Sequence, residues 1–168
     1  MKKMRKMLRV LTISLAVSAA GCGQGFRAVG YVEPELRRYV EAFETEYGVL
    51  VQYSVVFEGL PGGLVGQCRR WKDGRRKVVI DREFYESAGH WAMHQLVFHE
   101  LGHCSLGLGH NEGLNGDGYP VSTMYPYAFG GRYYGAHLSY YNDSLRDGRA
   151  RDAAVQRIGC VKFMNEYD

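Results

Sequence analysis

Three histidines and one glutamate lie within twelve residues, in a pattern suited to binding a metal ion. His99 and His103 are four residues apart, so on an α-helix both imidazoles lie on one face and can hold the same ion. Glu100 lies about 100° round the helix from His99, where its carboxylate can reach a water molecule without being a ligand. His110 follows as a third imidazole. Neutral imidazole ligands, an open fourth position and a nearby base are the requirements of a zinc hydrolase.

The flanking residues predict a helix that carries this motif and a turn that ends it. The run at positions 91–98 is apolar enough for a buried helix, which we expect to span Ala88 to Leu106. Gly107 can adopt the left-handed conformation that commonly ends a helix. The alternative interpretation is that His99 and His103 are ordinary core or surface residues of a helix that binds no metal.

A second motif lies downstream, where Met124 is followed by Tyr125 and Pro126. Together with the histidine motif, it resembles the metzincin clan of zinc peptidases. That clan combines His-Glu-x-x-His-x-x-Gly-x-x-His with a later methionine-containing turn beneath the metal. The Met-Tyr-Pro order is similar to the matrixin version of the turn, and the His-Glu-Leu-Gly-His-Cys core is similar to small bacterial metallopeptidase-like lipoproteins. The resemblance extends over about residues 76–130.

The resemblance implies roles for particular residues. His99, His103 and His110 would bind one zinc ion, Glu100 would be the general base, and Met124 would form the floor of the site. It also implies an α+β, zincin-like single domain with a small twisted sheet, an active-site helix, a methionine turn and a C-terminal helix. The implied activity is hydrolysis of peptide bonds in a peptide or protein substrate.

The spacing departs from the metzincin pattern by one residue. Three residues separate His103 from Gly107, where the clan has two. One extra helical residue moves the end of a helix by about 1.5 Å and 100°. We therefore expect the loop after Gly107 to compensate, with backbone freedom supplied by Gly109. His137 is the reserve ligand in case His110 does not reach the metal.

The N-terminal residues have the pattern of an export signal. Four basic residues among positions 2–6 precede an apolar stretch from Met7 to Ala20, which is too short to be a comfortable membrane span. We therefore expect residues 1–21 to be a signal peptide that is removed from the mature protein. Export of the chain is the consequence.

The end of this signal resembles the bacterial lipobox, at positions 18–22. The resemblance implies that Cys22 becomes lipidated, so that residues 22–32 form a short tether. The mature protein would then be anchored to a membrane of the bacterial cell envelope, the outer membrane, and would face the periplasm or the exterior. The alternative is ordinary cleavage near Gly21 that leaves Cys22 free.

Removal of the signal changes the charge of the protein. Its five basic residues leave 16 of the chain's 21 in the remainder, against 18 acidic residues, for a formal charge of −2. The excess of +3 in the whole chain therefore belongs to the signal, and we expect no nucleic-acid partner. The 147 residues that remain of 168 are enough for one domain, which we place at 33–168.

The rest of the chain predicts the helices and strands of this domain. A helix is expected to open at Glu33-Pro34-Glu35, with Pro34 in its first turn, and to end at Gly48. Strands are expected at Leu50–Phe57 and Lys77–Asp81, with a glycine-rich loop between them. A last helix should run from about Ser144 to Ile158.

Cysteine usage is compatible with an exported protein. With Cys22 assigned to the lipid, Cys68, Cys104 and Cys160 can form at most one intrachain disulfide. Cys104 points about 100° away from His103 on the helix, so it is not expected to bind the same metal. Because Cys68 lies just before a strand expected beside that helix, we expect a Cys68–Cys104 bridge. The alternative is a reduced Cys104 that packs as a small hydrophobic residue.

Two classes of function are compatible with these residues. In the first, the protein is an exported zinc peptidase in which Glu100 accepts a proton from water and passes it to the leaving amine. In the second, it is a zinc-binding scaffold of the cell envelope without turnover. The presence of Glu100 favours the enzyme, because a structural metal site has no use for a base.

Overall fold

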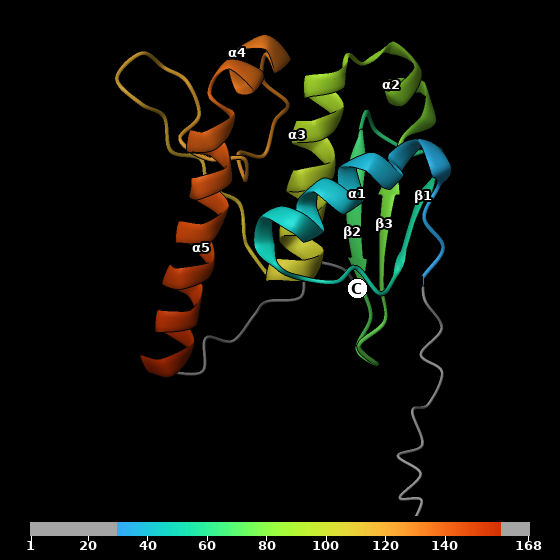
Figure 1. The fold of residues 1–168 in the computed structure, drawn as a ribbon, viewed down its shortest axis with the longest axis horizontal. Coiled ribbons are helices and arrows are strands. Elements are labelled where there is room, and N and C mark those ends of the chain that lie inside the picture. The colour runs from blue at the N-terminus through green and yellow to red at the C-terminus, as the bar shows by residue number, and fades with distance from the viewer. Residues whose placement is uncertain (1–29, 159–168) are drawn as a thin grey trace, which may run out of the picture.

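The computed structural model describes residues 30–158, and the side chains of residues 30–148. The predicted signal, Cys22 and Cys160 lie outside these residues. Within this part of the chain, five α-helices, one π-helical turn and a three-stranded sheet form an α+β fold, as predicted (Figure 1). The elements in chain order are α1 (Pro34–Tyr47), β1 (Ser54–Phe57), β2 (Gly66–Arg70), β3 (Arg76–Ile80), α2 (Arg82–Ser87), α3 (His90–Leu101), η1 (Gly102–Leu106), α4 (Gly131–Ala136) and α5 (Leu138–Ile158).

Helix α1 begins and ends at the predicted residues. Pro34 lies in the first turn, where a backbone N–H would have no helical partner, and Gly48 ends the helix with a φ of 62°. The N–H of Gly48 donates to the carbonyl of Glu44. The buried residues recur at helical spacing and pack into the common core: Leu36, Tyr39, Val40 and Phe43.

The sheet has the strand order β1-β3-β2, with β1 parallel and β2 antiparallel to the central strand β3. Val55 of β1 aligns with Val78 of β3, and both are fully buried in the core shared with α1 and α3. Val32 forms an isolated parallel bridge with Val55 of β1, so residues 30–32 belong to the fold and not to a tether. The predicted tether at 22–32 is therefore too long at its C-terminal end.

The predicted strands were only partly correct. The strand expected at Leu50–Phe57 is confined to β1, because Val51 donates its N–H to the side chain of Glu44 and not to a neighbouring strand. Strand β2 was missed because it begins with glycine and contains no β-branched or aromatic residue, and pairing with β3 forms it. Strand β3 lies within one residue of the prediction at both ends.

The predicted helix boundaries also need correction. Helix α3 begins at His90, two residues later than expected, after the extended residue Gly89. Helix α5 begins at Leu138 and not near Ser144, because Tyr141 and Leu145, four residues apart, are both fully buried and anchor its first turns. None of the described helices is long and apolar enough to cross a membrane.

Helix α3 is the central element of the fold. Every residue from Met93 to Leu101 is buried, so the helix is covered on all sides. Helix α1 and the sheet cover one side, and α4 and α5 lie on the other (Figure 1). Two glycines bring α4 close: Gly131 lies against Ala92, and Gly135 lies against the ring of Trp91. This packing holds the predicted ligand-bearing helix rigidly.

Candidate metal centre

The three predicted ligands meet at one point. The Nε2 atom of His103 lies 3.0 Å from Nε2 of His99 and 3.2 Å from Nε2 of His110. All three ligand atoms lie within 4.8 Å of one another, and no other such group of metal-binding side chains occurs among the described residues. Bonds of about 2.0–2.1 Å to a tetrahedral ion place donor atoms roughly 3.4 Å apart, so the spacing fits a metal site.

The other ring nitrogens show why this cluster suits a cation. Nδ1 of His99 lies 2.9 Å from the carbonyl oxygen of Thr123, and Nδ1 of His103 lies 2.6 Å from that of Leu108. A carbonyl only accepts, so each Nδ1 carries the proton and donates it. The two Nε2 lone pairs therefore face each other at 3.0 Å, an arrangement that repels unless a cation lies between them.

The protonation of these imidazoles favours the ligand form. Burial lowers the pKa of His99 to about 4. Burial also lowers the pKa of His103 to about 3, and the neighbouring His99 contributes to that shift. Both rings are therefore neutral at pH 7, the form in which imidazole binds metals.

His137, the reserve ligand, does not belong to the cluster. It is an exposed residue that follows α4, and its ring stacks on Tyr133 at a centroid distance of 4.2 Å. Its Nδ1 atom lies 2.9 Å from the carbonyl oxygen of Tyr133. The reserve assignment is therefore unnecessary, because His110 lies beside the other two imidazoles.

The extra residue after His103 is accommodated inside the helix. Residues 102–106 form the π-helical turn η1, in which the N–H of Gly107 bonds to the carbonyl of Gly102, five residues back. A π turn holds one residue more than an α turn, which matches the one-residue difference from the metzincin spacing. Gly107 then ends the helix with a φ of 73°, as predicted. Gly109 does not take a positive φ, and the extra residue lies in the π turn before Gly107.

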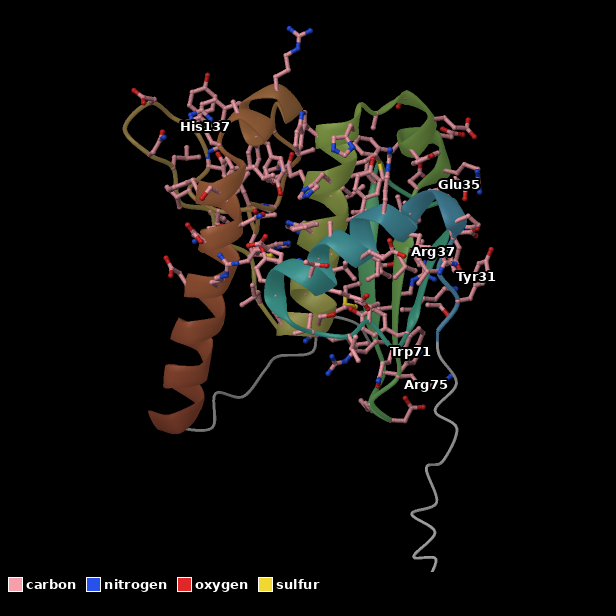
Figure 2. All side chains as sticks on the ribbon, in the orientation of Figure 1. Tyr31, Glu35, Arg37, Trp71, Arg75 and His137 are labelled. Atoms are coloured by element: carbon pink, nitrogen blue, oxygen red, sulfur yellow. A yellow bond between two sulfur atoms is a disulfide. The ribbon has the colours of Figure 1, made fainter. Side chains whose placement is uncertain are left out.

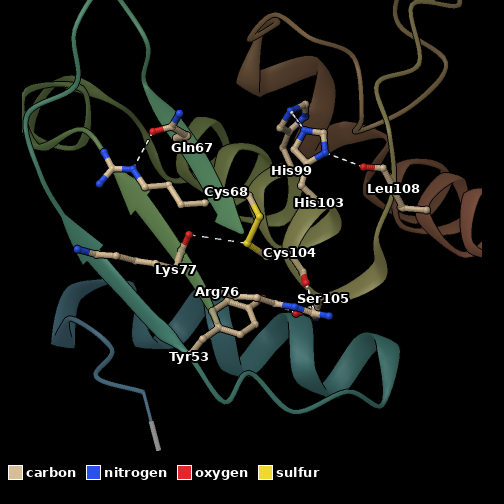
Figure 3. Close-up of a disulfide and its surroundings, with 11 residues drawn as sticks. Tyr53, Gln67, Cys68, Arg76, Lys77, His99, His103, Cys104, Ser105 and Leu108 are labelled. Atoms are coloured by element: carbon tan, nitrogen blue, oxygen red, sulfur yellow. Dashed lines mark hydrogen bonds between the residues drawn. A yellow bond between two sulfur atoms is a disulfide. The ribbon is translucent and has the colours of Figure 1, made fainter. Parts of the chain in front are cut away.

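Three contacts, from β2, from β3 and from the residue before β1, hold η1 in place (Figure 3). Cys104 forms a disulfide with Cys68 of β2, the pairing expected from the sequence. Arg76 of β3 donates to the carbonyl oxygen of Cys104 at 2.6 Å. The hydroxyl of Ser105 bonds to that of Tyr53, which precedes β1. A π turn is a less favourable helix geometry, and these contacts to the residues after His103 stabilise it.

Residues 122–124 form a buried turn that packs against the ligand-bearing helix. A Cβ atom on Gly102 would lie 2.6 Å from the sulfur of Met124, so the methionine packs directly against the ligand-bearing helix. Thr123, whose carbonyl receives the proton of His99, is fully buried. Helix α5 holds it through two bonds, from its N–H to Ser144 and from its hydroxyl to the carbonyl of Tyr141. Helix α5 therefore orients His99 through Thr123.

Glu100 lies between α3 and the edge strand β2, and only 5% of its surface is exposed. A Cβ atom on Gly66 of β2 would lie 2.8 Å from the Glu100 carboxylate, so this contact requires glycine. Burial raises the pKa of the Glu100 carboxyl to about 8, and a hydrogen bond from the backbone N–H of Cys68 opposes the rise. The environment thus favours acceptance of a proton.

Exposure increases from the first ligand to the third. His99 is buried, His103 is half-buried and His110 is exposed, so the cluster opens to solvent on the side of His110. Catalytic metal sites keep such an open position, whereas structural zinc sites are closed by four protein ligands. The geometry is compatible with entry of water and of a substrate.

Several residues that shape the site were not anticipated from the sequence. The carbonyls of Thr123 and Leu108 have no side-chain signature, so only the fold reveals them. Gly66 and Arg76 act through contacts with residues more than 25 positions away. Only the expected disulfide between Cys68 and Cys104 predicted from the sequence that β2 lies beside this helix.

Comparison with known proteins adds no relative: no family model, no curated protein and no solved structure matches this chain. The resemblance to metzincins is therefore carried by the motifs around His99 and Met124 alone.

Proposed function

We propose that this chain is a zinc-dependent peptidase of the zincin type. The observation that carries the proposal is the convergence of three Nε2 atoms at a solvent-open point, with the protons of His99 and His103 committed to backbone carbonyls. The buried carboxylate of Glu100, which follows a ligand directly, supports a catalytic and not merely structural site. The resemblance of the two sequence motifs to the metzincin clan supports the same class.

Zinc is the ion that this donor set fits best. The Nε2 atom of His103 lies 3.0 Å and 3.2 Å from the other two Nε2 atoms, which suits a tetrahedral ion, and zinc takes that geometry with nitrogen ligands. His99, His103 and His110 would hold it. A bound zinc ion supplies a Lewis acid that acidifies water and polarises the scissile carbonyl.

Glu100 acts as the proton carrier in this proposal. Its carboxylate takes a proton from water and returns it to the leaving amine. Gly66 and the N–H of Cys68 hold the carboxylate beside β2. Thr123 and Leu108 keep the ligand rings in the tautomer that leaves Nε2 free.

The experiment compares three proteins after loading with zinc: wild type, Glu100→Gln and Glu112→Gln. Glu112 is an exposed glutamate just beyond His110, so it is a matched control for the loss of one carboxylate near the site. We expect all three to bind one zinc ion. Cleavage of a broad peptide library should fall by about 10²-fold or more for Glu100→Gln alone.

The outcome separates the enzyme from a scaffold. If zinc-loaded wild type cuts no peptide, the non-catalytic zinc-binding scaffold of the cell envelope is the better assignment. If Glu100→Gln cuts as fast as wild type, the proposed role of Glu100 is wrong although the metal site stands.

We also propose that the protein is exported and held at a membrane by a lipid on Cys22. The support is the sequence pattern alone, a charged start, an apolar stretch and the lipobox-like segment 18–22. Metabolic labelling with a fatty-acid analogue should mark wild type and not Cys22→Ala. If neither protein is labelled and both are soluble, only export without an anchor is tenable.

A further inference from the structure

The hairpin of β2 and β3 concentrates positive charge. The nine residues from Arg69 to Lys77 hold six basic residues, one acid, Asp73, and one aromatic residue, Trp71. The chain after residue 21 has a formal charge of −2, yet these nine residues alone carry +5. The net charge of the chain conceals this asymmetry. Residues 70–76 are all exposed, and we call them the basic hairpin.

Like charges face each other across this hairpin. Arg70 lies opposite Arg76, and Arg69 lies opposite Lys77. Such pairs destabilise a sheet unless a counter-charge intervenes. Glu58 neutralises the second pair through ion pairs with both partners, but none of the ion pairs in the described part of the chain includes Arg70. The unrelieved repulsion points to an external anionic partner.

Apolar side chains accompany these cations. Trp71 is 41% exposed and Leu50 is 75% exposed, and both line a hollow of about 790 Å³ beside Arg75 and Arg76. The guanidinium of Arg75 lies 5.4 Å from the centre of the Trp71 ring, and Figure 2 shows the two side chains together at the end of the hairpin. Exposed tryptophan among cations is the chemistry of a membrane interface, where the ring lies among headgroups and the cations meet phosphates.

The chain enters the fold beside this surface. Gly30, the first described residue, lines the same hollow. The chain enters the fold at the end of the molecule where the hairpin lies (Figure 1). Cys22 precedes Gly30 by eight residues, and an extended chain of that length reaches at most about 29 Å. A membrane that holds the N-terminal segment is therefore within reach of the basic hairpin.

We propose that the basic hairpin, together with Leu50, docks on the headgroups of an anionic lipid membrane. Arg76 also holds η1 beside the metal centre, but none of residues 70–76 is a predicted metal ligand, and the inference does not depend on peptidase activity. It rests on the proposed export only because a membrane must lie close to the N-terminal segment. Docking would fix the orientation of the domain on the membrane.

The two tryptophans of the chain supply the test and its control. Trp71 belongs to the basic hairpin, whereas Trp91 packs on Gly135 of α4, at the opposite end of the molecule. Full-length Trp91→Phe and Trp71→Phe proteins each retain one tryptophan. Each is reconstituted in vesicles of phosphatidylethanolamine with about one-quarter phosphatidylglycerol, whose chains are brominated to quench tryptophan on contact. The N-terminal segment brings the chain to the vesicle, and fluorescence reports which face touches it.

We expect the emission of Trp71 to be quenched and shifted to the blue, and that of Trp91 to be unchanged. About 0.5 M NaCl, or neutral phosphatidylcholine vesicles, should abolish the quenching because screening shortens the reach of the charges. Each cation near an anionic surface contributes about fivefold to binding, so Arg70→Gln with Lys72→Gln should weaken docking about 25-fold. The matched control, Arg82→Gln with Arg132→Gln, removes two exposed cations from α2 and α4 and should retain it.

Three outcomes would overturn the proposal. If the emission of Trp71 stays unquenched on anionic vesicles, the hairpin faces away from lipid. Its cations would then serve only to protect a sheet edge. Equal quenching of both tryptophans would show that the domain has no preferred face. If Trp71 responds to a short single-stranded oligonucleotide and not to vesicles, the surface binds nucleic acid.

Discussion

Nδ1 of His103 donates its proton to the carbonyl oxygen of Leu108 at 2.6 Å, across the end of the π-helical turn. The N–H of Leu108 in turn bonds to the carbonyl of Gly102 at 3.1 Å. Leu108 thus joins the ligand-bearing helix to the segment that leads to His110. The second and third ligands are therefore oriented by one local structure, which accommodates the three residues between His103 and Gly107.

The first prediction concerns the ligand set. Loss of an outer hydrogen-bond partner of a metal ligand typically weakens metal binding roughly 10- to 100-fold. Alanine at His99, His103 or His110 removes a ligand itself, so zinc binding should weaken by more than that. His137→Ala is the control and should bind zinc as wild type does, because His137 lies outside the cluster. Competition with a chromophoric chelator measures the affinities. Wild-type affinity in His110→Ala would remove that residue from the site.

A second prediction concerns the contact between Gly66 and Glu100. A methyl group at Gly66 would approach the Glu100 carboxylate and the side chain of Leu96 to 2.8 Å, so Gly66→Ala must displace the proposed base. We expect peptide cleavage to fall at least tenfold while zinc remains bound, with a stability loss of about 1–3 kcal/mol for overpacking.

The matched control is Gly59→Ala, since a Cβ atom there meets nothing within 4 Å and its φ is not positive. Steady-state cleavage, zinc content and urea unfolding are measured on both variants. Full activity in Gly66→Ala would mean that the position of Glu100 does not depend on this strand.

The third prediction concerns the Cys68–Cys104 disulfide, which closes a loop of 36 residues. Replacing both cysteines by serine should lower the free energy of unfolding by about 3–4 kcal/mol, mainly through the gain in freedom of the unfolded chain. Zinc affinity should fall too, because Cys104 follows a ligand within η1. Cys160→Ser leaves the bridge intact and serves as the control. Unchanged zinc affinity in the double variant would show that Arg76 and Tyr53 suffice to hold the turn.

The fourth prediction concerns stability in acid. Burial lowers the pKa of His94 to about 4, and the nearby His90 adds to the effect, while Tyr39 and Tyr134 are the other titratable groups against its ring. Between pH 6.5 and 4 the unfolded chain therefore binds a proton that the folded protein does not. Stability should fall as the pH drops through this window, by up to about 1.4 kcal/mol per pH unit from this residue.

The measurement is urea unfolding at several pH values for wild type, His94→Gln and the exposed-residue control His137→Gln. His94→Gln removes the titrating group, so its stability should depend less steeply on pH below 6.5 than that of the other two proteins. Parallel pH profiles for all three would contradict the assignment of this acid sensitivity to His94.

Local spacing in the sequence determined the parts of the site that lie on one helix. His99 and His103 share a helix face because they are four residues apart, and Gly107 ends that helix because glycine tolerates a positive φ. Helix α1 likewise follows from its proline, its apolar spacing and Gly48. These features depend on residues close in the chain, so periodicity and helix-end preferences suffice to predict them.

Tertiary structure decided the features that depend on residues far apart in the chain. Strand β2 forms only because β3 offers it a partner, and it brings Gly66 to Glu100. The π turn is stabilised by contacts with all three strands or their flanks, and helix α5 holds Thr123 against His99. The basic hairpin likewise emerges from strand pairing, which sets its cations opposite one another. Packing and hydrogen bonds between distant segments outweigh the weak local preferences of these residues, and for that reason only the folded chain shows them.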